Sequence, residues 1–142
     1  MCMIDDAEPW EFFHDSHPRA RKEHRCDECS RVIQSGERYR YATGKCDGSF
    51  CVMRQCLHCV EVGRWLMVAC SGYLFNAVQE DLAEHVIGEE DYLRSAPLTR
   101  LLRWMRADWK RRDGSLRPLE DVTTVTDAAI AAYKEQMKKV AA

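Results

Sequence analysis

The sequence lacks a long apolar run and a secretory signal. No stretch of its 142 residues approaches the ~20 consecutive apolar residues that a membrane-spanning helix needs. Residues 1–13 have neither a basic start nor an apolar segment, and they carry four acidic side chains instead. We therefore expect a soluble, cytosolic (cytoplasmic) protein that makes no contact with a membrane.

Net charge is also nearly absent. The chain has 21 Lys and Arg residues against 23 Asp and Glu residues, which gives a formal charge of −2. Such a balance over the whole chain favours neither a nucleic-acid-binding protein nor an acidic tail. Hydrophobic residues make up 46% of the chain, which is enough for one compact domain or for a small module fused to a helical one.

Cysteine, by contrast, is abundant, with eight residues in the chain. In a reducing compartment we expect these cysteines to be metal ligands or buried thiols rather than disulfides. Cys26 and Cys29 form one C-x2-C pair, and Cys56 and Cys59 form a second pair after 26 intervening residues. Zinc prefers four thiolates in a tetrahedron, and a two-residue gap lets one tight turn present two of them. We predict that these four cysteines bind one structural zinc ion (Zn2+).

The other four cysteines do not extend this pattern. Cys46 and Cys51 flank a predicted turn, and their spacing to further ligands fits no usual zinc motif, so a second metal site is not expected. We expect Cys70 to be a buried thiol behind a helix and Cys2 to be inert.

The residues between the two cysteine pairs have the pattern of a β-hairpin. Tyr39, Tyr41 and Thr43 alternate with polar residues, and glycines mark the turns. The apolar stretch after Cys59 predicts a helix, whose first turn would carry the second pair where free N–H groups favour thiolate charge. A knuckle, a hairpin and a helix in this order are typical of a treble-clef zinc finger. The predicted fold class is α+β, mostly helical, with a treble-clef-like zinc module followed by additional C-terminal helices.

We divide the chain into an N-terminal lead-in (residues 1–25), the zinc module (26–72) and a helical region (73–142). We expect these parts to pack into one compact domain. A capping box of Asn76 and Gln79 is expected to open the first helix of the helical region. Residues spaced by three and four positions predict its buried face, which consists of Phe75, Val78, Leu82 and Val86.

Two more helices are predicted further along. Ser95 and Pro97 suit the start of the next helix. Its apolar stripe ends before the Asp113–Gly114 turn and consists of Leu98, Leu101, Leu102, Met105 and Trp109. Thr126 is expected to cap the last helix, whose apolar face consists of Ile130, Tyr133, Met137 and Val140.

Charge is unevenly distributed along the helical region. Residues 94–117 contain eight basic and two acidic side chains, a difference of +6, whereas residues 80–91 contain six acidic side chains and no Lys or Arg. A helical wheel places basic residues opposite the second apolar stripe, with an aromatic residue at the border. This candidate partner-binding surface consists of Arg100, Arg103, Trp104, Arg106, Lys110 and Arg111.

Two interpretations of this surface stay open. It is either the solvated side of a packed helix, paired with the acidic helix beside it, or a face that binds phosphates or an acidic protein surface. In the second case Trp104 would be available to stack on a partner.

Catalysis is not predicted. Nucleases of the His-Asn-His type carry a catalytic histidine on the hairpin of a treble clef, and no histidine lies between Cys29 and Cys56. Four thiolates close the coordination shell, whereas a catalytic zinc keeps one position open for water. His85 lies near Glu80, Asp81 and Glu84, which we interpret as a solvated acidic face. We expect no enzyme and no small-molecule substrate.

Several short motifs within residues 20–117 resemble those of one protein family. They are ARKEHRCDEC at 20–29, Ile33, GERY at 36–39, GK at 44–45, DG at 47–48, CLHC at 56–59, YLF at 73–75, EDL at 80–82, His85 and WKRRDG at 109–114. The chain is similar to uncharacterised zinc-finger proteins encoded by bacteriophages and prophages, and it departs from them at Cys46, where they often have an aromatic residue. The resemblance implies a small cytosolic phage product stabilised by zinc, and only the four paired cysteines carry over as ligands.

Two functions follow as hypotheses. The first is a non-enzymatic binding module that engages a host protein complex, as an inhibitor of host defence or of transcription. The second is a nucleic-acid-binding (DNA-binding) protein that uses the basic helix of residues 98–112 together with the basic segment 19–25. The nearly neutral total charge favours the first.

Overall fold

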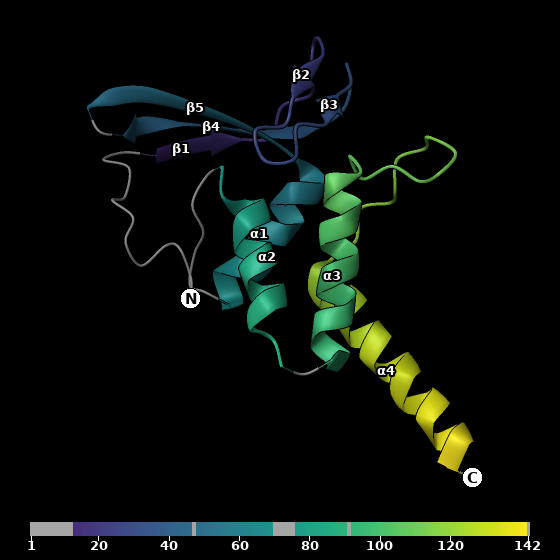
Figure 1. The fold of residues 1–142 in the computed structure, drawn as a ribbon. Helices are drawn as coiled ribbons and strands as arrows, with labels where there is room; N and C mark the ends of the chain where they lie inside the picture. Colours follow the sequence, from purple (N-terminus) through teal and green to yellow (C-terminus); the bar gives the residue numbers. More distant parts are fainter. Residues whose placement is uncertain (1–12, 47, 70–75, 91, 142) are drawn as a thin grey trace.

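The computed structural model of the chain describes residues 13–46, 48–69, 76–90 and 92–141. These residues form five β-strands followed by four α-helices (Figure 1). In chain order they are β1 (Phe13–Ser16), β2 (His24–Arg25), β3 (Val32–Ile33), β4 (Tyr39–Cys46), β5 (Ser49–Cys56), α1 (Leu57–Ala69), α2 (Val78–Gly88), α3 (Tyr92–Arg106) and α4 (Val122–Ala141). The α+β class is therefore confirmed.

The predicted hairpin is present as β4 and β5. The two strands pair in antiparallel register from Tyr39 opposite Cys56 to Cys46 opposite Ser49. The segment that we treated as a lead-in adds β1 to the other edge of β4, and an ion pair between Arg40 and Asp15 (3.0 Å) supports that pairing. Strand β1 was not predicted from the sequence, since four residues are too few to show a clear alternation of apolar and polar side chains. Its pairing also depends on β4, which lies more distant along the chain.

The first cysteine pair lies in a tight turn between β2 and β3. The two strands pair through His24 opposite Ile33 and Arg25 opposite Val32. Within the turn, the Ser30 N–H donates to the Cys26 carbonyl at 2.9 Å, and Ser30 has a φ of 66°. This left-handed residue lets the chain reverse directly after Cys29.

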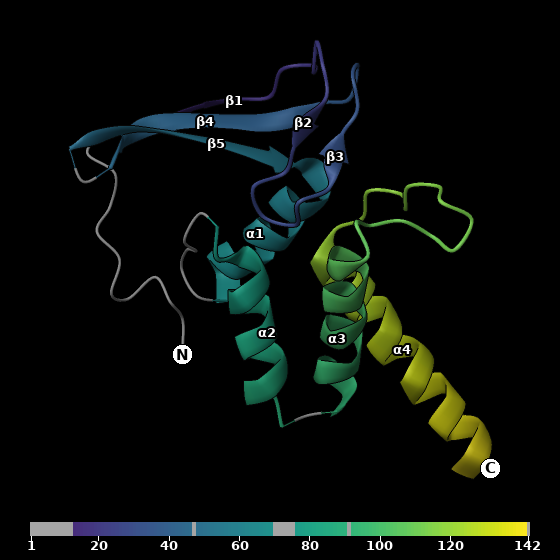
Figure 2. The same cartoon turned by 45° about the horizontal axis from the view of Figure 1, so that its top comes forward.

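Helices α1, α2 and α3 lie side by side against one end of the strands, with α2 and α3 antiparallel (Figures 1 and 2). One cluster of buried side chains joins the strands, α1 and the later helices. From the zinc module it includes Ile33, Val62 and Leu66. The other helices contribute Val78, Leu82, Leu98, Leu101, Leu102, Met105, Trp109 and Val122.

The buried stripe of α3 agrees with the prediction, but the start of the helix does not. Leu98, Leu101 and Met105 are at most 4% exposed. The helix begins at Tyr92, so Pro97 lies inside it rather than at its first position. At this position the proline removes one backbone hydrogen bond and its ring crowds the carbonyl four residues earlier, so it destabilises the first turn of α3.

The predicted caps of the other two helices are wrong. Asn76 has a φ of 68° and its side chain makes no cap hydrogen bond to α2. Helix α4 begins at Val122, four residues before Thr126, and the Asp121 carboxylate accepts a hydrogen bond from the Thr123 N–H at 2.8 Å. Asp121 is therefore the cap of α4, because its oxygen satisfies one of the free N–H groups at the helix start.

The predicted apolar face of α4 is largely uncovered. Tyr133, Met137 and Val140 are 38%, 45% and 71% exposed, and the side chain of Ile130 lies outside the described part. Figure 2 shows the C-terminal half of α4 extending beyond the N-terminal end of α3. Within the described residues, no helix combines the length and the apolar character of a membrane span.

Candidate metal centre

The structure brings the four predicted ligands together. The Sγ atoms of the four cysteines all lie within 4.8 Å of one another. All four residues are buried and none of them forms a disulfide; they are Cys26, Cys29, Cys56 and Cys59. The Cys29 and Cys56 Sγ atoms are 3.8 Å apart. Sulfur atoms at ~2.3 Å from a central ion in a tetrahedron are themselves ~3.8 Å apart, so the cluster is compatible with one bound metal ion.

Backbone hydrogen bonds hold the two cysteine pairs against each other. The Cys56 N–H donates to Cys26 Sγ at 3.3 Å, and the Glu28 N–H donates to the same sulfur at 3.4 Å. The Asp27 N–H donates to the Arg54 carbonyl and the Arg54 N–H donates to the Asp27 carboxylate. The turn between β2 and β3 is thereby fixed to the end of β5, where α1 begins.

Hydrogen bonds between the sulfur atoms lower the pKa of two of the cysteines, Cys26 and Cys56, and so favour thiolate there. Hydrogen bonds from Cys26, Cys29 and Cys59 lower the pKa of Cys56, and the positive charge of Arg31 adds to this effect. Arg31 is 2% exposed and pairs with Glu37 through two hydrogen bonds. A buried arginine beside the cluster offsets part of the negative charge that four thiolates and a divalent ion would retain.

The cluster is suited to a structural role. All four candidate ligands are thiols, and the sulfur atoms are buried, so a tetrahedral ion here has no position left for water. Thiolate ligands select soft or borderline ions such as zinc or iron rather than magnesium or calcium.

Glu28, between the first two cysteines, connects the metal centre to α2. It is 8% exposed, and its carboxylate accepts hydrogen bonds from the N–H groups of Asn76 (2.8 Å) and Val78 (3.2 Å) and from the Gln55 side chain (3.0 Å). Burial raises the pKa of Glu28. This carboxylate replaces the predicted capping box at the start of α2. This cap was not predicted, because nothing in the sequence around Glu28 indicates that its side chain is buried.

His58, between the second pair of cysteines, connects the metal centre to the segment after α3. Its Nε2 donates to the Arg117 carbonyl at 2.7 Å, and its ring centroid is 5.2 Å from that of Trp109. Burial lowers the pKa of His58, and the hydrogen bond to the Arg117 carbonyl opposes this effect because the protonated ring donates it as well. The local sequence does not indicate this contact, because Arg117 lies 59 residues after His58.

The predicted partner-binding residues lie at the surface, with one exception. Trp104 is half-buried, and the Arg117 guanidinium lies over its ring at 4.3 Å from the ring centroid. One indole face is therefore covered and not free for a partner to stack on. The basic members are exposed, and none of them makes an ion pair with another described residue; they are Arg100, Arg103, Arg106, Lys110 and Arg111.

Two other expectations need correction. Asp81, which we placed on a solvated acidic face, is fully buried, although Glu80 and Glu84 are exposed. Cys51 is disulfide-bonded, so cysteines outside the cluster are not all thiols. The expectations for Cys2 and Cys70, and for the side chain of Cys46, lie outside the described residues.

No protein-family model, curated protein or solved structure matches the chain. The similarity to phage zinc-finger proteins therefore stays a prediction based on short motifs.

Proposed function

We propose that the chain is a zinc-stabilised, non-enzymatic protein that binds the phosphate backbone of a nucleic acid through α3. The observation that supports this best is the set of exposed basic side chains on α3 and the turn after it, which form no ion pair with another described residue. A partner with regularly spaced negative charges would supply the missing counter-charges.

The metal part of the proposal is a structural zinc ion in a treble-clef-like module. Four thiolates from two C-x2-C pairs are a usual structural zinc set. The turn between β2 and β3, the β4–β5 hairpin and α1 follow each other in the order expected for that module. We expect one zinc ion per chain by elemental analysis of purified protein, and iron in its place would contradict the assignment.

The arrangement of α2 and α3 supports a free basic face. Helix α2 is rich in acidic residues and packs beside α3, yet within the described residues no ion pair joins the two helices. The exposed arginines at positions 100, 103 and 106 follow each other at three-residue steps, so they share one side of α3. The alternative interpretation, in which the acidic residues of α2 neutralise the basic side chains of α3, is therefore not favoured.

Base recognition is not part of this proposal. Trp104, the aromatic residue nearest to the basic face, is covered on one side by Arg117. Contacts to phosphates alone bind different sequences about equally well. With about four or five such contacts, the logarithm of the affinity is expected to fall with the logarithm of the salt concentration with a slope near −4.

Fluorescence anisotropy with a short labelled DNA duplex at several salt concentrations tests this function. Replacing Arg100, Arg103 and Arg106 together by Gln should weaken binding and make the salt slope shallower by about three units, because each phosphate contact contributes about one. The matched control replaces Lys134, Lys138 and Lys139 on α4 by Gln, which removes the same charge elsewhere. Binding that does not change with salt, or equal losses in both variants, would contradict the proposal.

A second candidate function is binding to a protein, and one observation favours it. Tyr133, Met137 and Val140 expose an apolar face on α4. The resemblance to phage proteins would make the partner a host protein complex and the chain an inhibitor of host defence or transcription. A pull-down from bacterial lysate with and without nuclease separates the two functions, since loss of every partner after nuclease treatment would exclude this one.

A further inference from the structure

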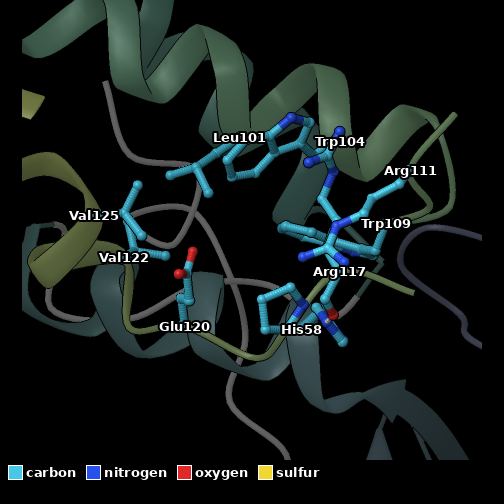
Figure 3. Close-up of a pocket in the computed structure, with 10 residues that line it drawn as sticks. His58, Leu101, Trp104, Trp109, Arg111, Arg117, Glu120, Val122 and Val125 are labelled. Atoms are coloured by element: carbon cyan, nitrogen blue, oxygen red, sulfur yellow. Dashed lines mark hydrogen bonds between the residues drawn. The ribbon is translucent and has the colours of Figure 1, made fainter. Parts of the chain in front are cut away.

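A cavity of about 230 Å³ lies between the metal centre and the last helix (Figure 3). It is bounded by α1, by the end of α3, by the segment between α3 and α4, and by the start of α4. The sequence predicted no small-molecule substrate, and the residues that line this cavity are spread over nearly 70 positions and form no motif. The cavity has three chemically distinct parts.

The first part is cationic. The guanidinium of Arg117 is held over the Trp104 ring, and Arg111 lines the cavity near it (Figure 3). Neither arginine forms an ion pair with another described residue. Arg117 is half-buried, and a partly desolvated guanidinium without a counter-charge favours a bound anion.

The second part is anionic and the third is apolar. Glu120 lines the cavity beside Val122, apart from the two arginines in Figure 3, and it also forms no ion pair with a described residue. Aliphatic side chains form the wall on the Glu120 side of the cavity in Figure 3, and of these Leu101 and Val122 are at most 4% exposed, whereas the His58 ring lies between Glu120 and the two arginines. One ligand that carries both charges would satisfy both ends.

Two features of residues in the wall and next to it agree with a bound ligand. The Nδ1 atom of His58 and the Nε1 atom of Trp109 are buried and have no hydrogen-bond partner in the described part of the chain. Such atoms are rare in folded proteins and call for a specific explanation. Asp108 and Trp109 both have a φ of 58°, and a bulky residue in this left-handed region is strained, which is typical of functional sites.

We propose that this cavity binds a free α-amino acid with an apolar side chain. Its carboxylate would contact Arg117 and Arg111, its ammonium group would contact Glu120, and its side chain would lie against Leu101 and Val122. The volume is below the ~300–1,000 Å³ of pockets for larger organic ligands, which suits a compact molecule. A mononucleotide fits less well, because Arg117 and His58 already lie against the two indole rings. This inference does not rest on nucleic-acid binding.

Isothermal titration calorimetry on the full chain with its metal tests the proposal. The probes are L-leucine, L-valine and L-phenylalanine, and the controls are L-leucine amide, N-acetyl-L-leucine and guanosine monophosphate. We expect one-to-one saturable binding of at least one of the three amino acids, and binding at least about tenfold weaker for its amide and its N-acetyl form, since each lacks one charged group. Binding of none of the three amino acids, equal binding of the N-acetyl form, or tighter binding of the nucleotide would overturn the proposal.

Variants locate the site. Arg111→Met and Glu120→Gln change exposed side chains and should each weaken binding at least about tenfold. Their matched controls are Arg112→Met and Glu80→Gln, which lie outside the cavity and should leave the affinity unchanged. Near-UV circular dichroism verifies that the variants are folded. Equal effects in the variants and their controls would show that the amino acid binds elsewhere.

Discussion

At the scale of single residues, Glu28 has a larger structural role than its position suggests. It lies between two candidate metal ligands and yet caps a helix that begins 50 residues later. A carboxylate at a helix start satisfies free N–H groups and interacts favourably with the helix dipole. The metal centre and α2 are therefore connected through one side chain.

The first prediction concerns this contact. Glu28→Ala should lower the free energy of unfolding by about 1–3 kcal/mol, because it removes the cap and leaves buried N–H groups without acceptors. Urea unfolding followed by far-UV circular dichroism measures the change. Glu23→Ala, at an exposed position before the cluster, is the control and should change stability little. Equal values for both variants would show that the cap contributes nothing.

A second prediction concerns one candidate ligand. Cys56→Ser should lose the bound metal and unfold at least the zinc module, because a serine hydroxyl is a poor substitute for a thiolate in a closed sulfur site. Elemental analysis measures the metal in purified protein. Cys51→Ser changes a cysteine outside the cluster and should retain the metal. A metal-loaded Cys56→Ser protein would speak against the ligand assignment.

At the scale of elements, the sequence predicted those features that depend only on residues close together in the chain. The hairpin follows from alternation around Tyr39 and Tyr41, and the buried side of α3 follows from the spacing of Leu98, Leu101 and Met105. Both patterns repeat within one element, so a short stretch of sequence contains all the information.

The elements that depend on distant partners were not predictable in this way. Strand β1 exists because it pairs with β4, and α2 starts where Glu28 can reach it. The cavity likewise joins His58 to residues after α3. In each case the deciding contact joins residues that other strands or helices separate along the chain, so the local sequence does not indicate it. The two cysteine pairs were an exception, because metal chemistry itself demands that they meet.

The third prediction concerns α4. Deletion of residues 134–142 should leave the melting temperature nearly unchanged, because the described side chains in this part of α4 are exposed, whereas the buried contact of α4 is made by Val122. Thermal unfolding monitored by circular dichroism measures the effect. Val122→Ala in the full chain is the comparison and should destabilise the protein by about 1–3 kcal/mol. A large loss on truncation would mean that the end of α4 is packed in solution.

At the scale of the whole molecule, one cluster of buried side chains contains the four cysteines and the apolar stripes of α2 and α3. Structural zinc in small modules contributes ~10–16 kcal/mol of apparent binding energy, whereas whole domains are stable by only ~5–15 kcal/mol. Loss of the metal should therefore affect the helices as well as the strands around the cluster.

The fourth prediction follows from that shared core. A strong chelator should abolish the near-UV circular dichroism of Trp104 and Trp109, although neither residue is close to the cysteines in sequence, because both lie in or against the shared core. Adding zinc back should restore the signal, which distinguishes metal loss from damage. An undiminished near-UV spectrum in chelator would show that the helical part folds independently of the metal.

X-ray absorption at the zinc edge tests the sulfur cluster most directly. We predict one zinc ion per chain, surrounded by four sulfur atoms at ~2.3 Å and by no nitrogen or oxygen ligand. Absence of zinc, or a coordination shell with fewer than four sulfur atoms, would contradict the account.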